Sequence, residues 1–440
     1  WEEVTLTDSA WANHVDEPVD VAITLPLGTC SSVDEIRVIA PDQVTEIPSQ
    51  VYDVVTTSGY ITSCRVVFLA TCPALSSVKY YIIYNNPSAT PPVYDGLRLY
   101  ELVPDDTYNV TALVGGVEKD YFYVLWKNLM HMYVNGTPLA QGNIFLGIGQ
   151  MSPATLWMDM RDGNLYFGAG KTLSVVNSGP VFVDFNYSEA YGTDLWGMLP
   201  PNYNVTYTCM LRVYFQPNLF PLVRYKSTFT IRTNMDWWAI GGPVIMDFRF
   251  GNSTFQSLYQ NFTYSLGWFG TTTVPVNTTL PWTTIYFPPW AIYGWWSYNG
   301  SRPDSTDKPV ANLGFIPVDA SGTAQEVSAG GYNEAFYQQT EPPGSFGDHH
   351  CGQWMLGVYN GTYGDTLGST GYIVTYGPVD GNIQPFMDNK AGGLRTPLGI
   401  SFKPALTADT NKDWYVDISD LVRAALAFGT TPGDSRWNPD

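Results

Sequence analysis

The chain of 440 residues carries 21 Lys and Arg against 40 Asp and Glu, and its formal net charge is −19. Because binding to phosphate groups needs a basic surface, we expect neither a nucleic-acid partner nor binding to an anionic membrane surface. Only 14% of the residues are charged while 15% are aromatic, and 41 Gly with 32 Pro indicate many turns. The composition therefore predicts an all-β protein of two or three domains with a sizeable core.

Two features of the sequence bear on export. No apolar run approaches the roughly 18 residues that a membrane span needs. The chain also begins at Trp1 rather than at Met, so we interpret it as a mature product whose signal peptide has been removed.

Residues 1–95 predict an antiparallel β-sandwich. Val19, Val21 and Ile23 alternate with polar residues and share one face of a strand. The same pattern recurs between turn residues at 36–38, 51–55, 60–69 and 78–84. Asn85-Asn86-Pro87 and the prolines that follow cannot extend a ladder, so a boundary is expected near residue 95.

Residues 96–404 predict a large β domain, either one unit or two fused sandwiches. Strands are expected at 180–187, 207–215, 225–232 and 244–250, and no helical period of useful length appears.

Two stretches of the sequence resemble a known architecture. Residues 178–185, followed by 210–214 and 222–225, resemble the middle of the mutarotase-like supersandwich of secreted polysaccharide lyases. The stretches 47–51 and 79–84 are similar to the front sandwich of such proteins. The resemblance spans about half of the chain and carries no catalytic motif, so it implies a fold rather than an activity.

Two further segments of the large domain are candidates for a functional role. Aromatic residues are dense from Trp282 to Tyr298 and are interrupted by Pro288-Pro289, which fits a packed core, a subunit contact or a saccharide platform. Asp348-His349-His350-Cys351 is either a metal or catalytic site or a polar loop held by a disulfide. The sequence contains no GxSxG, Walker, HExxH or Rossmann motif.

Residues 405–440 predict a calcium-binding half-module. A 12-residue loop places oxygen donors at positions 1, 3, 5, 7, 9 and 12, which is the set that Ca²⁺ prefers. These ligands are Asp409, Asn411, Asp413, the carbonyl of Tyr415, Asp417 and Asp420. A helix with Ile418, Leu421, Val422 and Ala425 on one face is expected to follow and to end at Gly429.

Residues 409–440 resemble the first repeat of a type I dockerin and the spacer after it. Two departures matter. Trp414 occupies position 6, which is normally Gly, at a cost of about 1 kcal/mol. The chain also stops where a second calcium loop would begin, so either the protein continues or a partner completes the module.

Glycosylation sequons and cysteines bear on the compartment. Five cysteines match no zinc or haem pattern; one disulfide is expected among Cys30, Cys64 and Cys72, and another between Cys209 and Cys351. Sequons are more frequent than composition predicts, which favours an exported protein with covalent N-glycans. The sequon residues are Asn109, Asn135, Asn186, Asn204, Asn252, Asn261, Asn277, Asn299 and Asn360.

Two functions from different classes follow. The first is a structural subunit of an extracellular, glycosylated, calcium-stabilised prokaryotic filament or surface layer. The alternative is a secreted carbohydrate-active enzyme, a polysaccharide lyase or glycoside hydrolase, or a carbohydrate-binding protein, with a dockerin-like tail. The missing catalytic motifs and the low charge favour the first, whereas the supersandwich resemblance and the dockerin-like tail favour the second. We choose the first.

The distribution of sequons predicts how copies of a structural subunit assemble. The first 108 and the final 80 residues carry no sequon, and these bare regions lie at opposite ends of the chain. We therefore expect head-to-tail contact between copies, because bulky glycans keep surfaces apart. Trp1–Thr7 is expected to add as a strand to a neighbour's sheet.

Overall fold

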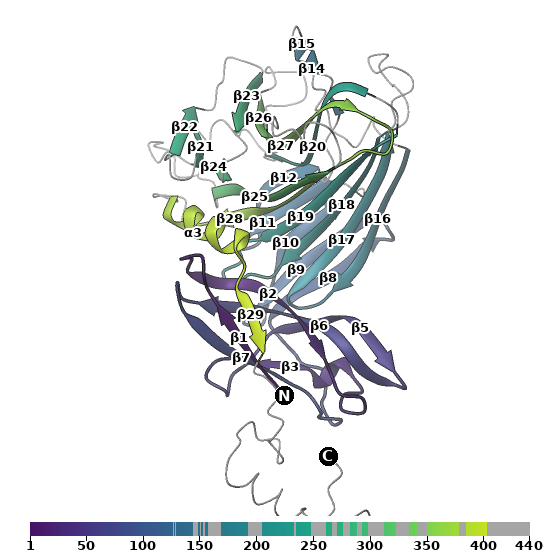
Figure 1. Cartoon of the computed structure of the whole chain (residues 1–440), viewed down its shortest axis with the longest axis vertical. Helices are drawn as coiled ribbons and strands as arrows, with labels where there is room; N and C mark the ends of the chain where they lie inside the picture. The colour runs from purple at the N-terminus through teal and green to yellow at the C-terminus, as the bar shows by residue number, and fades with distance from the viewer. Residues whose placement is uncertain are drawn as a thin grey trace, which may run out of the picture.

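The fold is mostly β, with several antiparallel sheets and one short α-helix near the C-terminal end (Figure 1). The structure is a computed structural model. It describes residues 1–125, 127, 129–143, 148–149, 151–152, 155–156, 169–191, 205–232, 235–247, 261–265, 271–275, 282–287, 293–297, 312–322, 334–340, 350–377 and 384–402. Among these residues no helix is long and apolar enough to cross a membrane.

Two sheets, here called the N-terminal sheets, lie at one end of the long axis of the molecule (Figure 1). The five-stranded sheet has the order β29 (Gly399–Phe402), β1 (Glu2–Thr7), β7 (Ser77–Ile83), β3 (Arg37–Ile39), β4 (Glu46–Ile47). The three-stranded sheet has the order β2 (His14–Thr24), β6 (Tyr60–Cys72), β5 (Ser49–Thr57).

The N-terminal sheets share one hydrophobic core. Val4 and Leu6 of β1 contribute to it from one sheet, and Val21 of β2 with Val66 and Phe68 of β6 contribute from the other. All five side chains are fully buried. Because successive strand residues point to opposite faces, these residues at every second position fall on one face.

Two larger sheets follow, and sheet membership changes between Ile83 and Gly96. The ten-stranded sheet has the order β23 (Trp282–Phe287), β26 (Glu334–Thr340), β27 (His350–Gly361), β20 (Met235–Asp247), β12 (Thr137–Asn143), β11 (Leu129–Val134), β10 (Val117–Leu125), β9 (Thr107–Val114), β8 (Gly96–Val103), with β13 (Ile148–Gly149) paired to β20. The nine-stranded sheet has the order β16 (Ala169–Ser178), β17 (Phe182–Tyr191), β18 (Val205–Tyr214), β19 (Leu222–Ile231), β28 (Thr366–Tyr376), β25 (Asn312–Gly322), β24 (Tyr293–Ser297), β21 (Asn261–Ser265), β22 (Thr271–Pro275). The strands β14 (Met151–Ser152) and β15 (Thr155–Leu156) form a separate pair, and the 3-10 helix η1 (Val33–Glu35) precedes β3.

The helix α3 (Gln384–Arg395) corrects the prediction that residues 96–404 contain strands without helices. Its buried residues Met387, Ala391 and Leu394 follow the spacing of one helical face. They join a second core with Tyr52 of β5 and Phe182 of β17. This core therefore connects the N-terminal sheets, α3 and the nine-stranded sheet.

The strand β29 returns from the far end of the described chain to the N-terminal sheets. It pairs antiparallel with one edge of β1, with Thr5 opposite Ser401, while the other edge of β1 pairs with β7. Both edges of β1 are occupied and Val4 and Leu6 are buried, so Trp1–Thr7 is not free to add to a neighbour's sheet as we expected. Its alternating apolar side chains, Val4 and Leu6, are buried in the core of its own N-terminal sheets.

Candidate functional site

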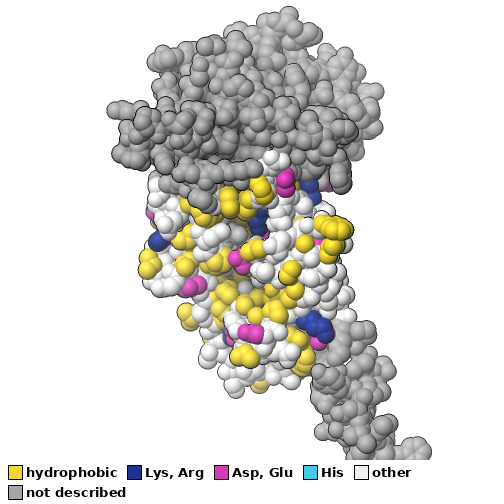
Figure 2. Space-filling model, turned by 90° about the vertical axis from the view of Figure 1, so that its left-hand side faces the viewer, with side chains coloured by type: hydrophobic (Ala, Val, Ile, Leu, Met, Phe, Trp, Pro, Cys, Tyr) yellow, Lys and Arg dark blue, Asp and Glu magenta, His cyan; other side chains and the backbone are white. Residues whose placement is uncertain are grey.

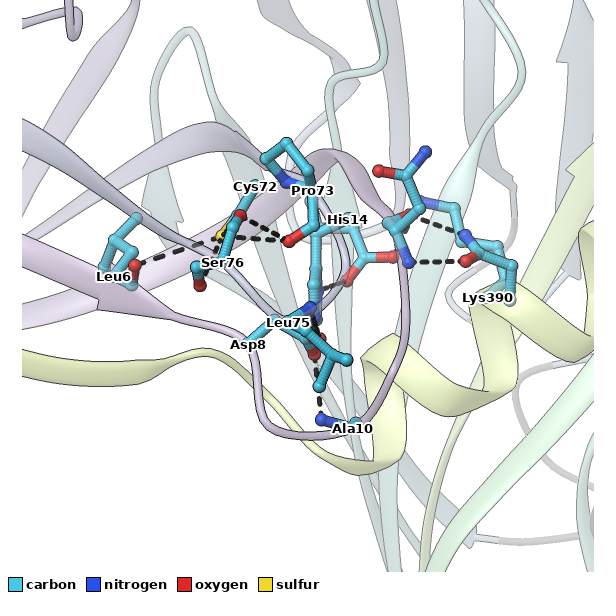
Figure 3. Close-up of polar contacts among 12 residues, drawn as sticks. Leu6, Asp8, Ala10, His14, Cys72, Pro73, Leu75, Ser76 and Lys390 are labelled. Atoms are coloured by element: carbon cyan, nitrogen blue, oxygen red, sulfur yellow. Dashed lines mark hydrogen bonds and ion pairs between the residues drawn. The ribbon is translucent and has the colours of Figure 1, made fainter.

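A group of buried charged side chains, here called the His14 cluster, lies where the N-terminal sheets meet α3 (Figure 3). It consists of Asp8, His14, Glu17 and Lys390, each at least nine-tenths buried. Asp8 is the first of residues 8–13, which connect β1 to β2. His14 is the first residue of β2, and Glu17 lies further along that strand. Because Val19, Val21 and Ile23 of the same strand face the core, Glu17 falls in their alternating series.

Each charge in the cluster faces an opposite charge. The Nε2 atom of His14 lies 3.0 Å from Oδ1 of Asp8, and its Nδ1 atom lies 2.8 Å from Oε2 of Glu17. The Nζ atom of Lys390 lies 3.3 Å from Oε1 of Glu17 and donates to the carbonyl oxygen of Val15 at 3.3 Å. With His14 protonated, two cations balance two carboxylates. Pairing of this kind is what permits charges to remain buried.

The pKa values follow from these contacts. Burial alone would lower the pKa of His14, but the hydrogen bonds and charges of Glu17 and Asp8 outweigh it and raise the pKa above its ordinary value. Burial would likewise raise the pKa of Asp8. The backbone N–H groups of Leu75 and Ala10, with His14, outweigh that effect and hold the pKa of Asp8 at about 2.

The cluster is unsuited to nucleophilic catalysis, although a thiol lies across the strand pair. Cys72 is opposite His14 in the register of β2 and β6. A catalytic base needs a ring nitrogen that can accept the proton of the thiol. Both nitrogens of His14 face carboxylates, and Cys72 is fully buried with Sγ 3.5 Å from the carbonyl oxygen of Ser76. The arrangement therefore supports positioning rather than chemistry.

The cluster positions residues 8–13, the connection between β1 and β2, which is here called the Trp11 loop. The backbone N–H of Asn13 donates to Oδ1 of Asn389 at 2.6 Å, and Nδ2 of Asn389 donates to the carbonyl of Asn13 at 2.6 Å. The Asp8 carboxylate accepts from the N–H groups of Ala10 at 3.0 Å and Leu75 at 2.7 Å. The loop is thus tied to α3 and to the turn before β7.

The backbone around the loop is strained. Trp11 has φ of 61° and Leu75 has φ of 54°, and both side chains are exposed. A positive φ costs an L-residue about 1–2 kcal/mol, and such residues persist where the surrounding structure fixes them. The hydrogen bonds of Asp8 and Asn389 supply that fixation here.

A second charged network lies between β2, β5, β6 and the nine-stranded sheet. Arg212 of β18 donates to both carboxylate oxygens of Asp184 at 2.7 and 2.8 Å, and its guanidinium lies 4.0 Å over the ring of Phe182. Arg65 pairs with Asp20 at 2.9 Å. Bidentate pairing with stacking is the geometry that suits a buried Arg.

This network gathers the residue types of a lyase site, but its contacts oppose that role. The hydroxyl of Tyr52 donates to Asp20. Burial and the neighbouring Asp20 raise the pKa of Tyr52, whereas a catalytic base would need a lowered one. The Asp184 carboxylate is committed to Arg212 and to Nδ2 of Asn177 at 2.9 Å.

Few of the sequence-predicted sites fall on described residues with described side chains. The whole calcium loop, Asp409 to Asp420, lies outside the described residues, as do Asp348 and His349. His350 and Cys351 begin β27. Among described side chains, no group of three or more His, Cys, Asp or Glu is placed to hold a metal ion.

The cysteine prediction needs a correction. Cys209 is a free, buried thiol, so the expected disulfide with Cys351 is absent from the structure. Cys209 lies in the nine-stranded sheet while Cys351 lies in the ten-stranded sheet. Cys30, Cys64 and Cys72 are also free thiols, buried in the core of the N-terminal sheets.

The dense aromatic run divides between sheets. Trp282–Phe287 forms β23 of the ten-stranded sheet, and Tyr293–Ser297 forms β24 of the nine-stranded sheet. The two described parts therefore pair with different neighbours rather than with each other.

Three sequon residues have described side chains. Asn186 of β17 and Asn135 in the turn between β11 and β12 are exposed. Asn109 of β9 is half-buried, and its Nδ2 donates to the hydroxyl of Tyr123 at 2.6 Å and to Asp120 at 3.2 Å. Asn261 and Asn360 lie in β21 and β27, and Asn204, Asn252, Asn277 and Asn299 lie outside the described residues.

Sequence reasoning missed the His14 cluster, although one signal was present. Glu17 is a carboxylate at a position that the alternation of Val19, Val21 and Ile23 assigns to the core face. A charge at such a position needs a buried partner. No family model matches this chain, and a comparison with curated proteins found no match.

Proposed function

We propose that this protein is a structural subunit of an extracellular, glycosylated filament or surface layer that calcium stabilises. The observation that carries the proposal is the pairing of β29 with β1. It brings described parts of both sequon-free regions, 1–108 and 361–440, together at one end of the molecule (Figure 1). That end, the N-terminal sheets, is called the bare pole below.

The positions of the glycans determine where two copies can pack closely. All strands of the N-terminal sheets come from residues 2–83 and 399–402, whereas the nine sequons lie between Asn109 and Asn360. A hydrated glycan stays in solvent and holds neighbouring proteins apart. A tight contact between copies is therefore favoured at the bare pole, where packing can exclude water.

The pairing of β29 changes the arrangement that we propose for the copies. Head-to-tail contact was expected because the bare regions lie at opposite ends of the sequence. Their described parts lie together in space, so we propose that the bare pole of one copy contacts a second copy and is one of the contacts on which a larger assembly depends.

The finer architecture is also part of the proposal. We infer that the N-terminal sheets form a β-sandwich, since they share one core, and that the larger sheets form the central domain. Residues 405–440 would form the calcium-binding half-module, with Ca²⁺ held by Asp409, Asn411, Asp413, Tyr415, Asp417 and Asp420.

Negative-stain electron microscopy and sedimentation velocity of the full-length glycosylated protein test the proposal, in calcium and in EDTA. We expect filaments or sheets in calcium and a lower melting temperature in EDTA. The variant Asp409→Ala/Asp413→Ala should melt in calcium as the wild type does in EDTA. A monomer at high concentration in calcium would contradict the structural role, and identical melting of the wild type in both buffers would contradict the calcium site.

A further inference from the structure

One arginine of the nine-stranded sheet lies beside the Arg212 network and has no acidic partner among the described residues. Arg224 of β19 is directly opposite Arg212 of β18 on one side and Tyr372 of β28 on the other, so the three side chains share one face of the sheet. We propose that Arg224 and the hydroxyl of Tyr372 bind a small ligand that carries one carboxylate. This binding site is independent of the structural role.

The guanidinium of Arg212 is fully used inside the protein, whereas that of Arg224 is not. Arg212 donates to both oxygens of Asp184, and its third nitrogen, Nη1, lies 3.6 Å from Oδ2 of Asp20. The Nε atom of Arg224 is buried, and no described residue accepts its hydrogen. Buried donors in folded proteins nearly always have an acceptor, so an orphaned one points to a bound water or ion. Two like charges directly opposite one another also repel, which an anion beside them would relieve.

The balance of charge here leaves room for a single negative charge. Arg65, Arg212 and Arg224 share two carboxylates, those of Asp20 and Asp184, and both are already paired with Arg65 or Arg212. One positive charge is therefore left over. A carboxylate neutralises it and matches the planar fork of a guanidinium. A phosphate monoester carries about 1.5 to 2 negative charges near neutral pH, so it would leave an excess negative charge in a chain whose net charge is already −19.

Tyr372 supplies a second donor next to Arg224. Burial raises the pKa of Tyr372, although the nearby charge of Arg224 opposes that shift. The hydroxyl therefore keeps its proton at neutral pH and can donate it in a hydrogen bond. A guanidinium and a protonated hydroxyl side by side suit a carboxylate, because an ionised carboxylate only accepts hydrogen bonds.

A ligand can reach the site along the exposed part of the same face. Arg224 and Tyr372 are half-buried, and Lys226, two residues further along β19, is exposed. Lys226 lies opposite Thr370 of β28, so both residues are next to the site and can contact hydroxyl groups of a ligand larger than acetate. Figure 2 views the molecule from the α3 side and shows Lys and Arg side chains of described residues only as small, separate patches, so few basic groups on that face compete for an anion.

Thermal melting of the full-length glycosylated protein tests the inference, in EDTA so that calcium-dependent assembly does not enter. The probes are sodium acetate and sodium D-gluconate, and the controls are sodium chloride at equal ionic strength and D-glucose. Because a ligand that binds only the folded state stabilises it, both carboxylates should raise the melting temperature of the wild type in a saturable way, and the controls should not. Arg224→Gln should weaken the apparent affinity at least tenfold, and Tyr372→Phe should weaken it less. The matched control Arg98→Gln changes an exposed arginine of β8 in the ten-stranded sheet and should leave the affinity unchanged.

Melting without a carboxylate separates a binding role from a structural one. Arg224→Gln removes a charge that has no partner, so this variant should melt at or above the wild type in chloride. Arg212→Gln leaves Asp184 buried without its partner and should melt well below the wild type.

Three results would overturn the inference: no saturable effect of acetate and gluconate on the wild type, an effect that Arg224→Gln retains, or an Arg224→Gln variant that melts far below the wild type in chloride. None of them bears on assembly in calcium. A protein that binds carboxylates but stays monomeric in calcium would overturn the structural role alone.

Discussion

At the scale of single residues, Glu17 links two segments of the chain that are far apart in the sequence. Its two carboxylate oxygens contact His14 on the same strand and Lys390 on α3, at 2.8 and 3.3 Å. A residue from the start of the chain and one from near its described end are thereby held together. Removing either partner leaves a buried charge without compensation.

The substitution Glu17→Gln should destabilise the protein by about 3–5 kcal/mol, because it leaves Lys390 and His14 with one carboxylate between them. Chemical denaturation measures the change. The matched control is Glu3→Gln, which removes the carboxylate of an ion pair whose partner Lys79 is exposed, and it should cost about 1 kcal/mol or less. Equal effects of the two substitutions would contradict the role given to the His14 cluster.

The His14 cluster also predicts how stability depends on pH. The pKa of His14 is raised in the folded state, so its contribution is fully present below 6.5 and is lost as the pH rises through the higher folded value. The pKa of Asp8 falls from 3.8 to about 2, so its contribution is present above 3.8 and is lost as the pH falls toward 2. The His14→Gln variant should lose the first dependence and keep the part of the second that the N–H groups of Leu75 and Ala10 supply, as melting temperatures at a series of pH values would measure.

Glycan occupancy should differ between sequons for a reason visible at their side chains. The Nδ2 atom of Asn109 already donates to Tyr123 and Asp120, whereas Asn186 is exposed on β17. We expect glycopeptide mass spectrometry to find sugar on Asn186 and none on Asn109, because a glycan needs a free, solvent-facing amide. The reverse pattern would overturn this assignment.

At the scale of elements, α3 shows how a short helix is fixed by contacts that its sequence does not display. A Cβ atom on Gly393 would lie 2.6 Å from Oε2 of Glu17, whereas one on Gly392 would lie 3.4 Å from Cβ of Ala12. The carboxylate cannot easily move, since His14 and Lys390 hold it. The helix therefore approaches β2 closely at Gly393.

This contrast gives a matched pair of substitutions. Ala normally stabilises a helix by about 1 kcal/mol relative to Gly, so Gly392→Ala should be neutral or stabilising. Gly393→Ala should destabilise, because its methyl group displaces the Glu17 carboxylate from its partners. If denaturation shows that both substitutions stabilise the protein, the close packing of α3 on β2 is wrong.

The elements also show what the sequence could and could not predict. The strands of residues 14–24 and 60–72 follow from alternating apolar residues, because one face of each lines a core. The helix α3 was missed since Gly392, Gly393 and a buried lysine interrupt its apolar face. The strand β29 was missed because its partner β1 lies almost 400 residues away in the sequence, and pairing at that distance leaves no local signal.

The candidate site was also missed because its residues are far apart in the sequence. The sequence analysis did not single out His14, because its cluster is assembled from the connection 8–13, β2 and the distant helix α3. The composition of the Arg212 network could not be assembled from sequence either, since β2, β5, β17 and β18 meet only through the fold. Long-range packing, rather than local propensity, decides both.

At the scale of the whole molecule, several contacts hold the bare pole to the larger sheets. They include the core that Tyr52, Phe182, Tyr214 and α3 share, and the pairing of Arg212 with Asp20 at 3.6 Å. The Oε1 atom of Gln50 also accepts from the backbone N–H groups of Val181 and Phe182. The N-terminal sheets are therefore joined to the nine-stranded sheet by packed side chains as well as by the chain itself, so a load applied to one is transmitted to the other. Such a joint suits a subunit that bears contacts at one end and glycans elsewhere.

The central claim is that copies meet through the bare pole. Hydrogen exchange with mass spectrometry, comparing the protein assembled in calcium with the dispersed protein, tests it most directly. The account predicts that the largest gain in protection falls within residues 1–83 and 399–402. Protection gained chiefly on the sequon-bearing strands between Asn109 and Asn360, with none at the bare pole, would contradict it.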